Sequence, residues 1–180
     1  MTRFAYVMSA CFATMAITVT AFIHPAPRLI WNASASIPVG LYSARPATSA
    51  KVGDLVALTP PADLAALLAQ RHYLPRGLPL LKPVAAIARQ RVCRVGTAVS
   101  IDGHRVADTL SRDRRGRLLP IWQGCRLLGK GELFVMNPAS RDSFDGRYFG
   151  PLPISALRAK LRPVWVYAAA SAQPSHVVRR

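Results

Sequence analysis

An uncharged segment of twenty residues near the N-terminus limits how this chain can fold more than any other feature. It runs from Phe4 to Ile23, FAYVMSACFATMAITVTAFI, and contains no Asp, Glu, Lys or Arg. A helix of about 20 apolar residues matches the thickness of the hydrocarbon core of a bilayer. We therefore expect one N-terminal transmembrane helix that stays in the protein as an anchor.

Two other interpretations of this segment are weaker, and only the first stays open. A cleaved signal peptide has an apolar region of about 7–15 residues followed by small residues, as at Val19-Thr20-Ala21, but this segment is longer. A buried helix of a soluble core would carry polar positions on one face, and this segment shows no such face. Arg3 on the short leading side and the long domain behind the segment predict a single span in the inner (cytoplasmic) membrane, with the domain in the periplasm.

The charge balance suggests an anionic partner. The chain has 24 Lys and Arg against 8 Asp and Glu, a formal net charge of +16 over 180 residues, which is typical of proteins that meet anionic lipid or nucleic acid. The basic residues are dispersed, and only RDRRGR at 112–117 is locally dense. Without a basic arm or an RNA-binding aromatic motif, we expect membrane lipid as a partner and no specific nucleic acid.

The cysteines agree with an exported domain. Cys11 lies inside the apolar segment, which leaves Cys93 and Cys125 as the only pair beyond it. An even pair beyond an export segment is typical of a disulfide. Two unpaired buried thiols are the alternative.

Prolines and glycines divide the rest of the chain into short segments, as in a mainly β fold. The 15 prolines and 11 glycines indicate many turns, and Asp102-Gly103 is a hairpin turn signal. A helix is expected over 61–71. Strands are expected over 51–60, 80–87, 91–103, 131–138 and 162–169.

Catalytic chemistry must come from groups other than histidine. None of the four histidines has the spacing of a metal site or of a Ser-His-Asp triad, so we expect no metal and no cofactor. A lysine in apolar surroundings is another possible base, because desolvation lowers its pKa. Lys82, within PLLKPVAAI, is such a lysine. The alternative is an outward-facing strand residue with its stem along the surface.

Three motifs in order add to this interpretation. SASIPVGLY follows the apolar segment, LLKPVAAI lies 46 residues further on, counted from Ser36 to Lys82, and SFDGRYFGPLP begins at Ser143. This order resembles the type I signal peptidase superfamily, and the match is closer to its conjugative-transfer branch, the TraF-type serine peptidases. The resemblance covers nearly all of 34–165. It implies a signal-peptidase-like fold of coiled antiparallel sheets.

The resemblance also implies roles for individual residues. Ser36 would be the nucleophile and Lys82 the general base, with the Ser34 hydroxyl and the Ser36 amide forming the oxyanion hole. The residues that would support this Ser/Lys dyad are Ser143, Asp145 and Arg147. A neutral amine can take the hydroxyl proton, and two fixed donors can stabilise the charge that develops.

Two positions depart from the family pattern. Arg89-Gln90 stands where the family usually has Gly-Asp after the lysine motif, which puts the geometry of that loop in question. Gly146 stands where serine is common, a change that we expect to be tolerated.

The predicted organisation is an anchor or signal segment at 1–26, an extracytoplasmic Ser/Lys peptidase domain at 27–170 and a flexible tail at 171–180. The expected function is processing of exported precursor proteins, such as a pilin precursor, in a conjugative transfer system. A general type I signal peptidase and a catalytically silent basic scaffold of the transfer apparatus are the alternatives.

Overall fold

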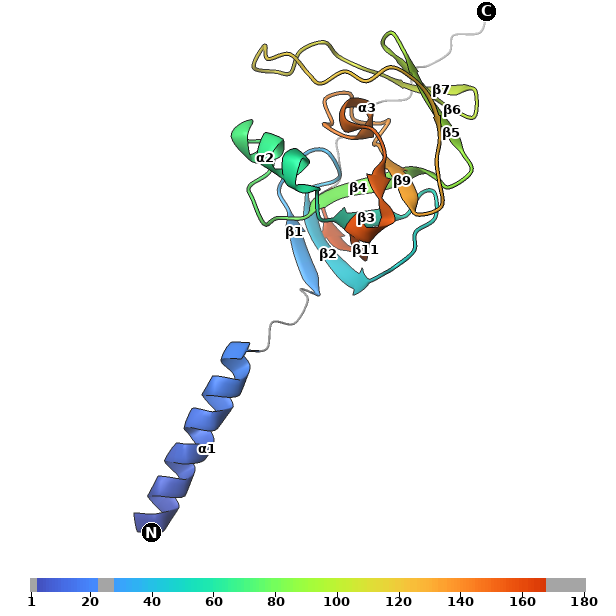
Figure 1. Cartoon of the computed structure of the whole chain (residues 1–180). Coiled ribbons are helices and arrows are strands. Elements are labelled where there is room, and N and C mark those ends of the chain that lie inside the picture. The colour runs from blue at the N-terminus through green and yellow to red at the C-terminus, as the bar shows by residue number, and fades with distance from the viewer. Residues whose placement is uncertain (1–2, 23–27, 168–180) are drawn as a thin grey trace, which may run out of the picture.

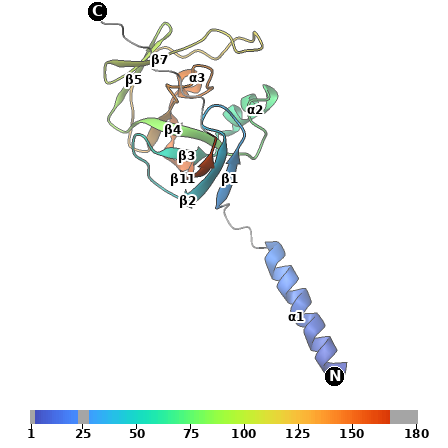
Figure 2. The same ribbon diagram turned by 180° about the vertical axis from the view of Figure 1, so that it is seen from behind.

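The computed structural model describes residues 3–22 and 28–167. The expected tail at 171–180 lies outside these residues. Two antiparallel sheets make up most of the domain, and Figures 1 and 2 show the smaller sheet at the opposite end of the domain from β1 and β2. The helices are α1 (Arg3–Phe22), α2 (Ala62–Gln70), α3 (Gly146–Phe149) and the 3₁₀ turn η1 (Ile154–Ala156).

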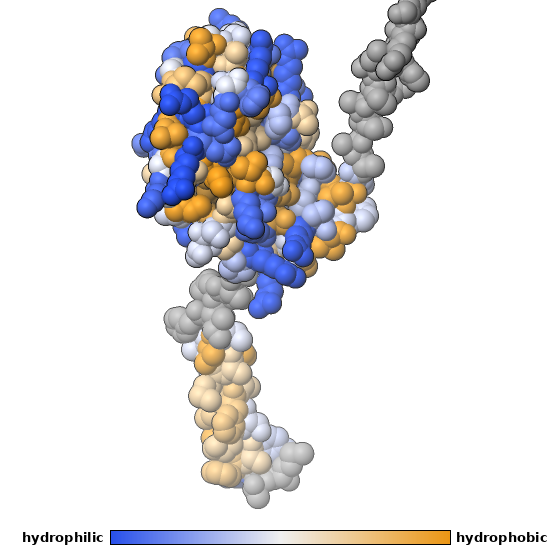
Figure 3. Space-filling model, turned by 90° about the vertical axis from the view of Figure 1, so that its right-hand side faces the viewer, coloured by the Kyte–Doolittle hydropathy of each residue, from blue (hydrophilic) through white to orange (hydrophobic). Residues whose placement is uncertain are grey.

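The expected N-terminal apolar helix is present as α1. It is 20 residues long, and it is the one helix of the described residues that is long and apolar enough to cross a membrane. Figure 3 shows α1 as largely hydrophobic, whereas hydrophilic side chains cover much of the visible face of the domain. This contrast is the one expected between an anchor and a domain in water.

The larger sheet has seven antiparallel strands in the order β1-β2-β11-β3-β4-β9-β10. Gly40, at the start of β2, allows the close approach of β11: a Cβ on it would lie 2.2 Å from the carbonyl oxygen of Trp165. The strands are β1 (Leu29–Asn32), β2 (Gly40–Pro46), β3 (Leu55–Leu58), β4 (Leu80–Ile87), β9 (Glu132–Val135), β10 (Leu152–Pro153) and β11 (Leu157–Val166).

The smaller sheet, of order β7-β6-β5-β8, carries the disulfide. Cys93 and Cys125 face each other in the register of β5 and β8, and their sulfur atoms are bonded. They are separated by 32 positions, and a loop of that length contributes about 3–4 kcal/mol in the chain-entropy account. The strands are β5 (Arg91–Val95), β6 (Ala98–Ile101), β7 (His104–Asp108) and β8 (Gly124–Leu127).

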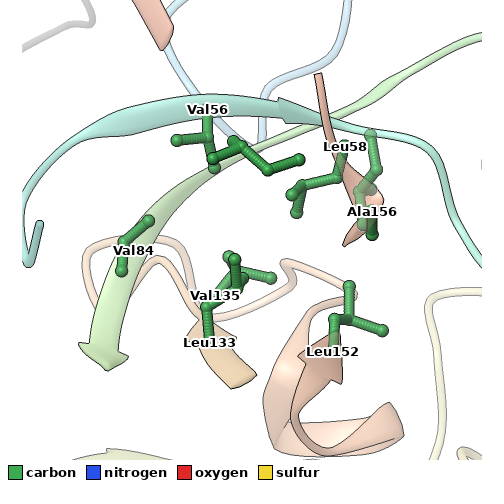
Figure 4. Packing of buried hydrophobic residues seen from close by; sticks show 9 residues of the cluster. Val56, Leu58, Val84, Leu133, Val135, Leu152 and Ala156 are labelled. Carbon is green, nitrogen blue, oxygen red and sulfur yellow. The ribbon is translucent and has the colours of Figure 1, made fainter. Parts of the chain in front are cut away.

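The main core lies between the strands of the larger sheet and the segment after α3. Figure 4 shows side chains from β3, β4 and β9 packed against Leu152 and Ala156. Valine and leucine dominate this cluster, as expected where strands are covered on a face. The buried members are Val56, Leu58, Leu80, Val84, Leu133, Val135, Leu152, Ala156 and Leu157.

The secondary structure differs from the sequence-based prediction in several places. The single strand predicted over 91–103 is two strands, because the chain turns at Gly96, where φ is +60°. The hairpin turn at Asp102-Gly103 is confirmed, with φ values of +50° and +84°. The last strand starts at Leu157, before the predicted 162. β1, β2, β7, β8 and β10 were not predicted as strands, since short or partly exposed strands carry weak alternation.

Candidate active site

Ser36 lies in the turn that joins β1 to β2. Asn32, the last residue of β1, holds this turn: its Oδ1 accepts from the Ser34 amide at 3.1 Å, and its Nδ2 donates to the carbonyls of Ile37 and Pro38 at 3.2 and 3.0 Å. Asn32 is buried. The turn is therefore fixed from inside, while the Ser36 side chain stays partly exposed.

The two serine hydroxyls of this turn are hydrogen-bonded to each other. Ser34 Oγ lies 3.0 Å from Ser36 Oγ and donates to Asn32 Oδ1 at 3.0 Å. Because a hydroxyl has one proton, Ser36 is then the donor in the pair. The backbone N–H of Ser36 has no hydrogen-bond partner within residues 28–167. It is free to bind a developing oxyanion.

Lys82 lies in the middle of β4, opposite Val56 of β3. Its side chain is only 2% exposed, so it is an inward-facing lysine and not the outward-facing strand residue of the alternative interpretation. Its Nζ donates a 2.8 Å hydrogen bond to Ser143 Oγ. The two residues are 61 positions apart, and the fold alone brings them together.

Burial lowers the pKa of Lys82 to about 8. Desolvation is the largest cause, Asp145 opposes it by favouring the ammonium, and Arg147 adds to it by repulsion. An amine with a pKa near 8 is neutral in a substantial fraction of molecules at physiological pH. Lys82 can therefore accept a proton, as a lysine in water cannot.

Asp145 and Arg147 form a buried ion pair directly after Ser143. Asp145 caps α3 by accepting from the Arg147 amide, and its Oδ1 also accepts from Arg147 Nε at 2.9 Å. The two side chains are 0% and 1% exposed. A buried pair of this kind is stable only when its remaining donors and acceptors are satisfied.

Backbone groups make the remaining hydrogen bonds of the Asp145–Arg147 ion pair. Arg147 donates to the carbonyls of Asn137 at 2.7 Å, Asp108 at 3.2 Å and Ser140 at 3.3 Å, and Asp145 Oδ2 accepts from the Asn137 amide at 3.1 Å. The guanidinium thus ties the loop before Ser143 to α3. This arrangement fixes the position from which Ser143 meets Lys82.

The four polar side chains open into one cavity of about 690 Å³, a size typical of ligand sites. Ser34, Ser36, Lys82 and Ser143 all line it. No hydrogen bond joins Ser36 to Lys82 in the described part of the chain. The structure thus brings the predicted residues to one site, with the serine pair and the lysine pair as separate contacts.

The comparison with protein families agrees with this arrangement. The family described as signal peptidase, peptidase S26, matches residues 1–166. The chain belongs to the S26 signal peptidase family. Membership of this family supports a serine peptidase, and together with α1 it indicates a membrane-anchored protein.

Two relatives of this member of the S26 family are named as conjugal transfer proteins. It is 37% identical over 150 residues to the "Probable conjugal transfer protein TraF" of Sinorhizobium fredii, covering 76% of this chain and 77% of that one. It is 38% identical over 149 residues to the "Conjugal transfer protein TraF" of Agrobacterium fabrum, covering 76% and 81%. A solved signal peptidase I from Enterococcus faecalis matches at 17% identity with a TM-score of 0.37, over 63% of this chain and 97% of that one.

Arg89 and Gln90, the first departure from the family pattern, form a regular turn between β4 and β5. Arg89 has a φ of +73°, a conformation that costs a non-glycine residue about 1–2 kcal/mol. Gln90 Oε1 accepts from the Ile87 amide at 3.0 Å, and its Nε2 donates to Asp102 at 2.9 Å. Gln90 thus holds the loop closed although the aspartate that the family usually has in this turn is absent.

Gly146, the second departure, is more tightly constrained than the sequence suggested. A Cβ at this position would lie 2.7 Å from the Phe134 ring and 2.7 Å from the Val135 carbonyl oxygen. Real Cβ atoms do not approach backbone so closely. In this chain a serine at 146 would force α3 away from β9, so glycine and Phe134 fit each other.

Three polar residues of the site were not found from the sequence. Asn32 holds the serine turn, and Asn137 donates from Nδ2 to the Ser36 carbonyl at 2.6 Å. Buried Arg94, next to Cys93 in β5, donates to the Arg147 carbonyl at 2.7 Å. Asn32 stands two residues before the SASIPVGLY motif, so its closeness to Ser34 and Ser36 in the sequence was a signal for it. The other two act across long sequence separations.

Proposed function

We propose that this chain is a membrane-anchored Ser/Lys endopeptidase that processes exported precursor proteins, such as a pilin precursor, in a conjugative transfer system. The observation that carries the peptidase is the buried Lys82 amine, with its lowered pKa, in the cavity that Ser36 also lines. The relatives named for conjugal transfer support the place in conjugation.

In the proposed acylation step, Ser36 Oγ attacks the scissile carbonyl. Neutral Lys82 takes the hydroxyl proton, while its hydrogen bond to Ser143 keeps the amine in place. The oxyanion is bound by the free Ser36 N–H and by the Ser34 hydroxyl, which turns from Asn32 to do so. The lysine then gives its proton to the leaving amine, and the acyl group remains on Ser36 as an ester.

The ester can be resolved by two nucleophiles. Water activated by Lys82 gives a linear product, and an amine held in the attack position gives an amide. If that amine is the N-terminus of the same precursor, the product is circular. The proposal includes this second route for a pilin precursor.

The mass of the product tests the function and separates the two routes. We expect co-expression with the pilin precursor of the same transfer system to give a Ser36-dependent product that is lighter than the linear hydrolysis product by one water, measured by intact mass spectrometry. A product at the linear mass would support the peptidase and exclude the cyclisation route. An unprocessed precursor, with the S26 protein present in the membrane, contradicts both.

The two alternatives give different results in the same experiment. A general signal peptidase would also process unrelated exported precursors that carry a signal peptide. A catalytically silent scaffold would process none. The retained Ser36, Lys82 and Ser143 favour the enzyme, and the regular turn at Arg89-Gln90 removes one reason to expect a silent protein.

We also propose that the chain lies in the inner membrane with its domain in the periplasm. An aromatic cluster supports contact between the domain and membrane lipid. Trp31, Trp165 and Tyr167 are each about half exposed, at 53%, 51% and 54%. Their rings contact one another, with centroids 4.5 Å apart for Trp165 and Tyr167. Amphipathic rings favour the membrane interface. Leu29 follows Phe22, the end of α1, by seven positions, a span of at most about 25 Å.

Lipid quenching tests the aromatic cluster. The chain has three tryptophans, so a Trp31→Phe, Trp122→Phe variant reports on Trp165 alone. We expect anionic vesicles with brominated acyl chains to quench Trp165 fluorescence. The matched control, Trp31→Phe with Trp165→Phe, leaves Trp122, which lies against Phe134 and stays unquenched. Equal quenching of the two variants would refute the placement.

A further inference from the structure

The wall of the catalytic cavity is strongly basic. It is formed by the segment after α2, by the loop between β7 and β8, and by the loop before Ser143. Its cations outnumber its carboxylates. The charged residues that line the cavity are Arg71, Lys82, Arg114, Arg115, Arg117, Asp113 and Asp142.

Two of the arginines are neutralised by the two carboxylates. Arg117 pairs with Asp113 at 2.7 Å, and Arg114 pairs with Asp142 at 2.5 Å. The hydroxyl of Tyr73 donates to Asp113 at 2.5 Å and is the main reason why the pKa of that carboxyl lies well below its usual value. Asp113 therefore stays ionised and continues to hold Arg117.

Arg71 and Arg115 keep their charge without a carboxylate. Arg71 donates from Nη1 to the Leu118 carbonyl at 2.7 Å, a neutral partner, and its own carbonyl accepts from Arg117 at 3.1 Å. The Arg115 guanidinium has no partner within residues 28–167. Two uncompensated guanidinium groups therefore face a cavity that also holds Ser36 and Lys82.

This arrangement differs from the dispersed positive charge of the rest of the domain. On the open surface some exposed arginines have carboxylate neighbours, such as Arg105 with Asp108, and others within residues 28–167, such as Arg45 and Arg162, have none. What distinguishes Arg71 and Arg115 is that both line one concave site. In a concave site with low-dielectric walls, unmatched charges of one sign strengthen one another. Guanidinium groups bind carboxylates through paired hydrogen bonds.

We propose that Arg71 and Arg115 bind a carboxylate of the substrate near the scissile bond. The carboxylate is either an Asp or Glu side chain or the free C-terminus of a chain that is cut close to its end. The proposal rests on the proposed function, since it takes Ser36 as the point of cleavage. It gives the cavity a preference for acidic over neutral peptides.

Peptide binding to the full-length Ser36→Ala protein in detergent tests this proposal without requiring cleavage. The probes are four fluorescein-labelled alanine-rich octapeptides, with one Glu or one Gln in the middle and with a free or an amidated C-terminus. We expect the matching acidic peptide to bind about tenfold more tightly than its neutral counterpart in fluorescence anisotropy, the factor expected for a charge-assisted hydrogen bond. A preference for Glu over Gln identifies the side chain, and a preference for acid over amide identifies the C-terminus.

Arginine variants test whether the preference for acidic peptides comes from the cavity wall. Arg115→Gln, an exposed change without a broken contact, and Arg71→Gln should each remove most of the preference, whereas the control Arg105→Gln on β7 should retain it. Equal affinity for acidic and neutral peptides would overturn the proposal, as would a preference that survives Arg71→Gln with Arg115→Gln. Precursor processing is measured separately, so its failure would count against the peptidase and not against this binding site.

Discussion

We expect Ser36→Ala to abolish precursor processing while the protein stays folded and membrane-bound. Lys82→Ala should have the same result, and Lys82→Arg should also fail to process the precursor. A guanidinium stays charged and cannot act as a base, and an alanine leaves the Ser36 proton without an acceptor. The loss of one member of such a pair lowers the rate by about 10³-fold or more. The measurement is conversion of the precursor, followed by intact mass.

Lys82→Met is the matched control for folding. With the Lys82 pKa lowered from 10.5 to about 8, a charged amine in the native protein at pH 7 costs about 3 kcal/mol relative to the unfolded chain. An apolar side chain of similar length avoids this cost. We therefore expect Lys82→Met to be inactive but at least as stable as the original protein at pH 7. Substantial processing by Ser36→Ala or by Lys82→Met would contradict the dyad.

The same pKa predicts how the rate depends on pH. The active form of Lys82 is the neutral amine, so its fraction falls about tenfold for each pH unit below a pKa of about 8. Processing should rise from pH 6 to pH 8 and level off above it. Stability follows a different window, because the unfolded lysine binds more protons between pH 8 and 10.5 and stability rises across that range. A flat rate profile from pH 6 to 9 would exclude Lys82 as the base.

Replacing Arg147 by methionine should destabilise the domain by about 3–5 kcal/mol. The change leaves the Asp145 carboxylate buried without its partner, and such a charge is costly. It also removes the donors to the carbonyls of Asn137 and Ser140. The expected fall in melting temperature exceeds about 10 °C. Trp122 fluorescence can follow the transition, because its Nε1 donates to the Gly146 carbonyl at 3.1 Å in α3.

An exposed ion pair provides the comparison. Arg105 and Asp108 are 65% and 49% exposed, and pairs of this kind contribute less than about 1 kcal/mol. Arg105→Met should therefore leave the melting temperature nearly unchanged. If Arg147→Met and Arg105→Met melt within about 2 °C of each other, the buried pair does not hold the domain together as described.

Local patterns in the sequence carried much of what could be predicted. The apolar run at 4–23 predicted the helix α1, because a helix of about 20 apolar residues needs no tertiary partner to be recognised. The family followed from the order of three short motifs. The two cysteines beyond the apolar run predicted the disulfide, since only one pairing was available in the domain.

Other features were decided by packing alone. Whether Lys82 points inward or outward could not be read from PLLKPVAAI, because a strand in a curled sheet has apolar residues on both faces. Its burial, and hence its pKa near 8, exists only when β3 and Ser143 lie against it. Gly146 was expected to be tolerated in place of serine, but that glycine is required in this chain could not be read from the sequence, because it is the Phe134 ring that leaves no room for a Cβ.

The sequence by itself determined the anchor, the family and the identity of the residues that carry the proposed chemistry. The tertiary structure alone determined their environment. Asn137 reaches Ser36 across 101 positions. Arg71 and Arg115, which have no carboxylate partner within residues 28–167, line the same cavity as Lys82. The physical reason is range. Helix length and motif order are local properties of the chain, whereas desolvation and charge pairing depend on which distant segments the fold brings within a few ångströms.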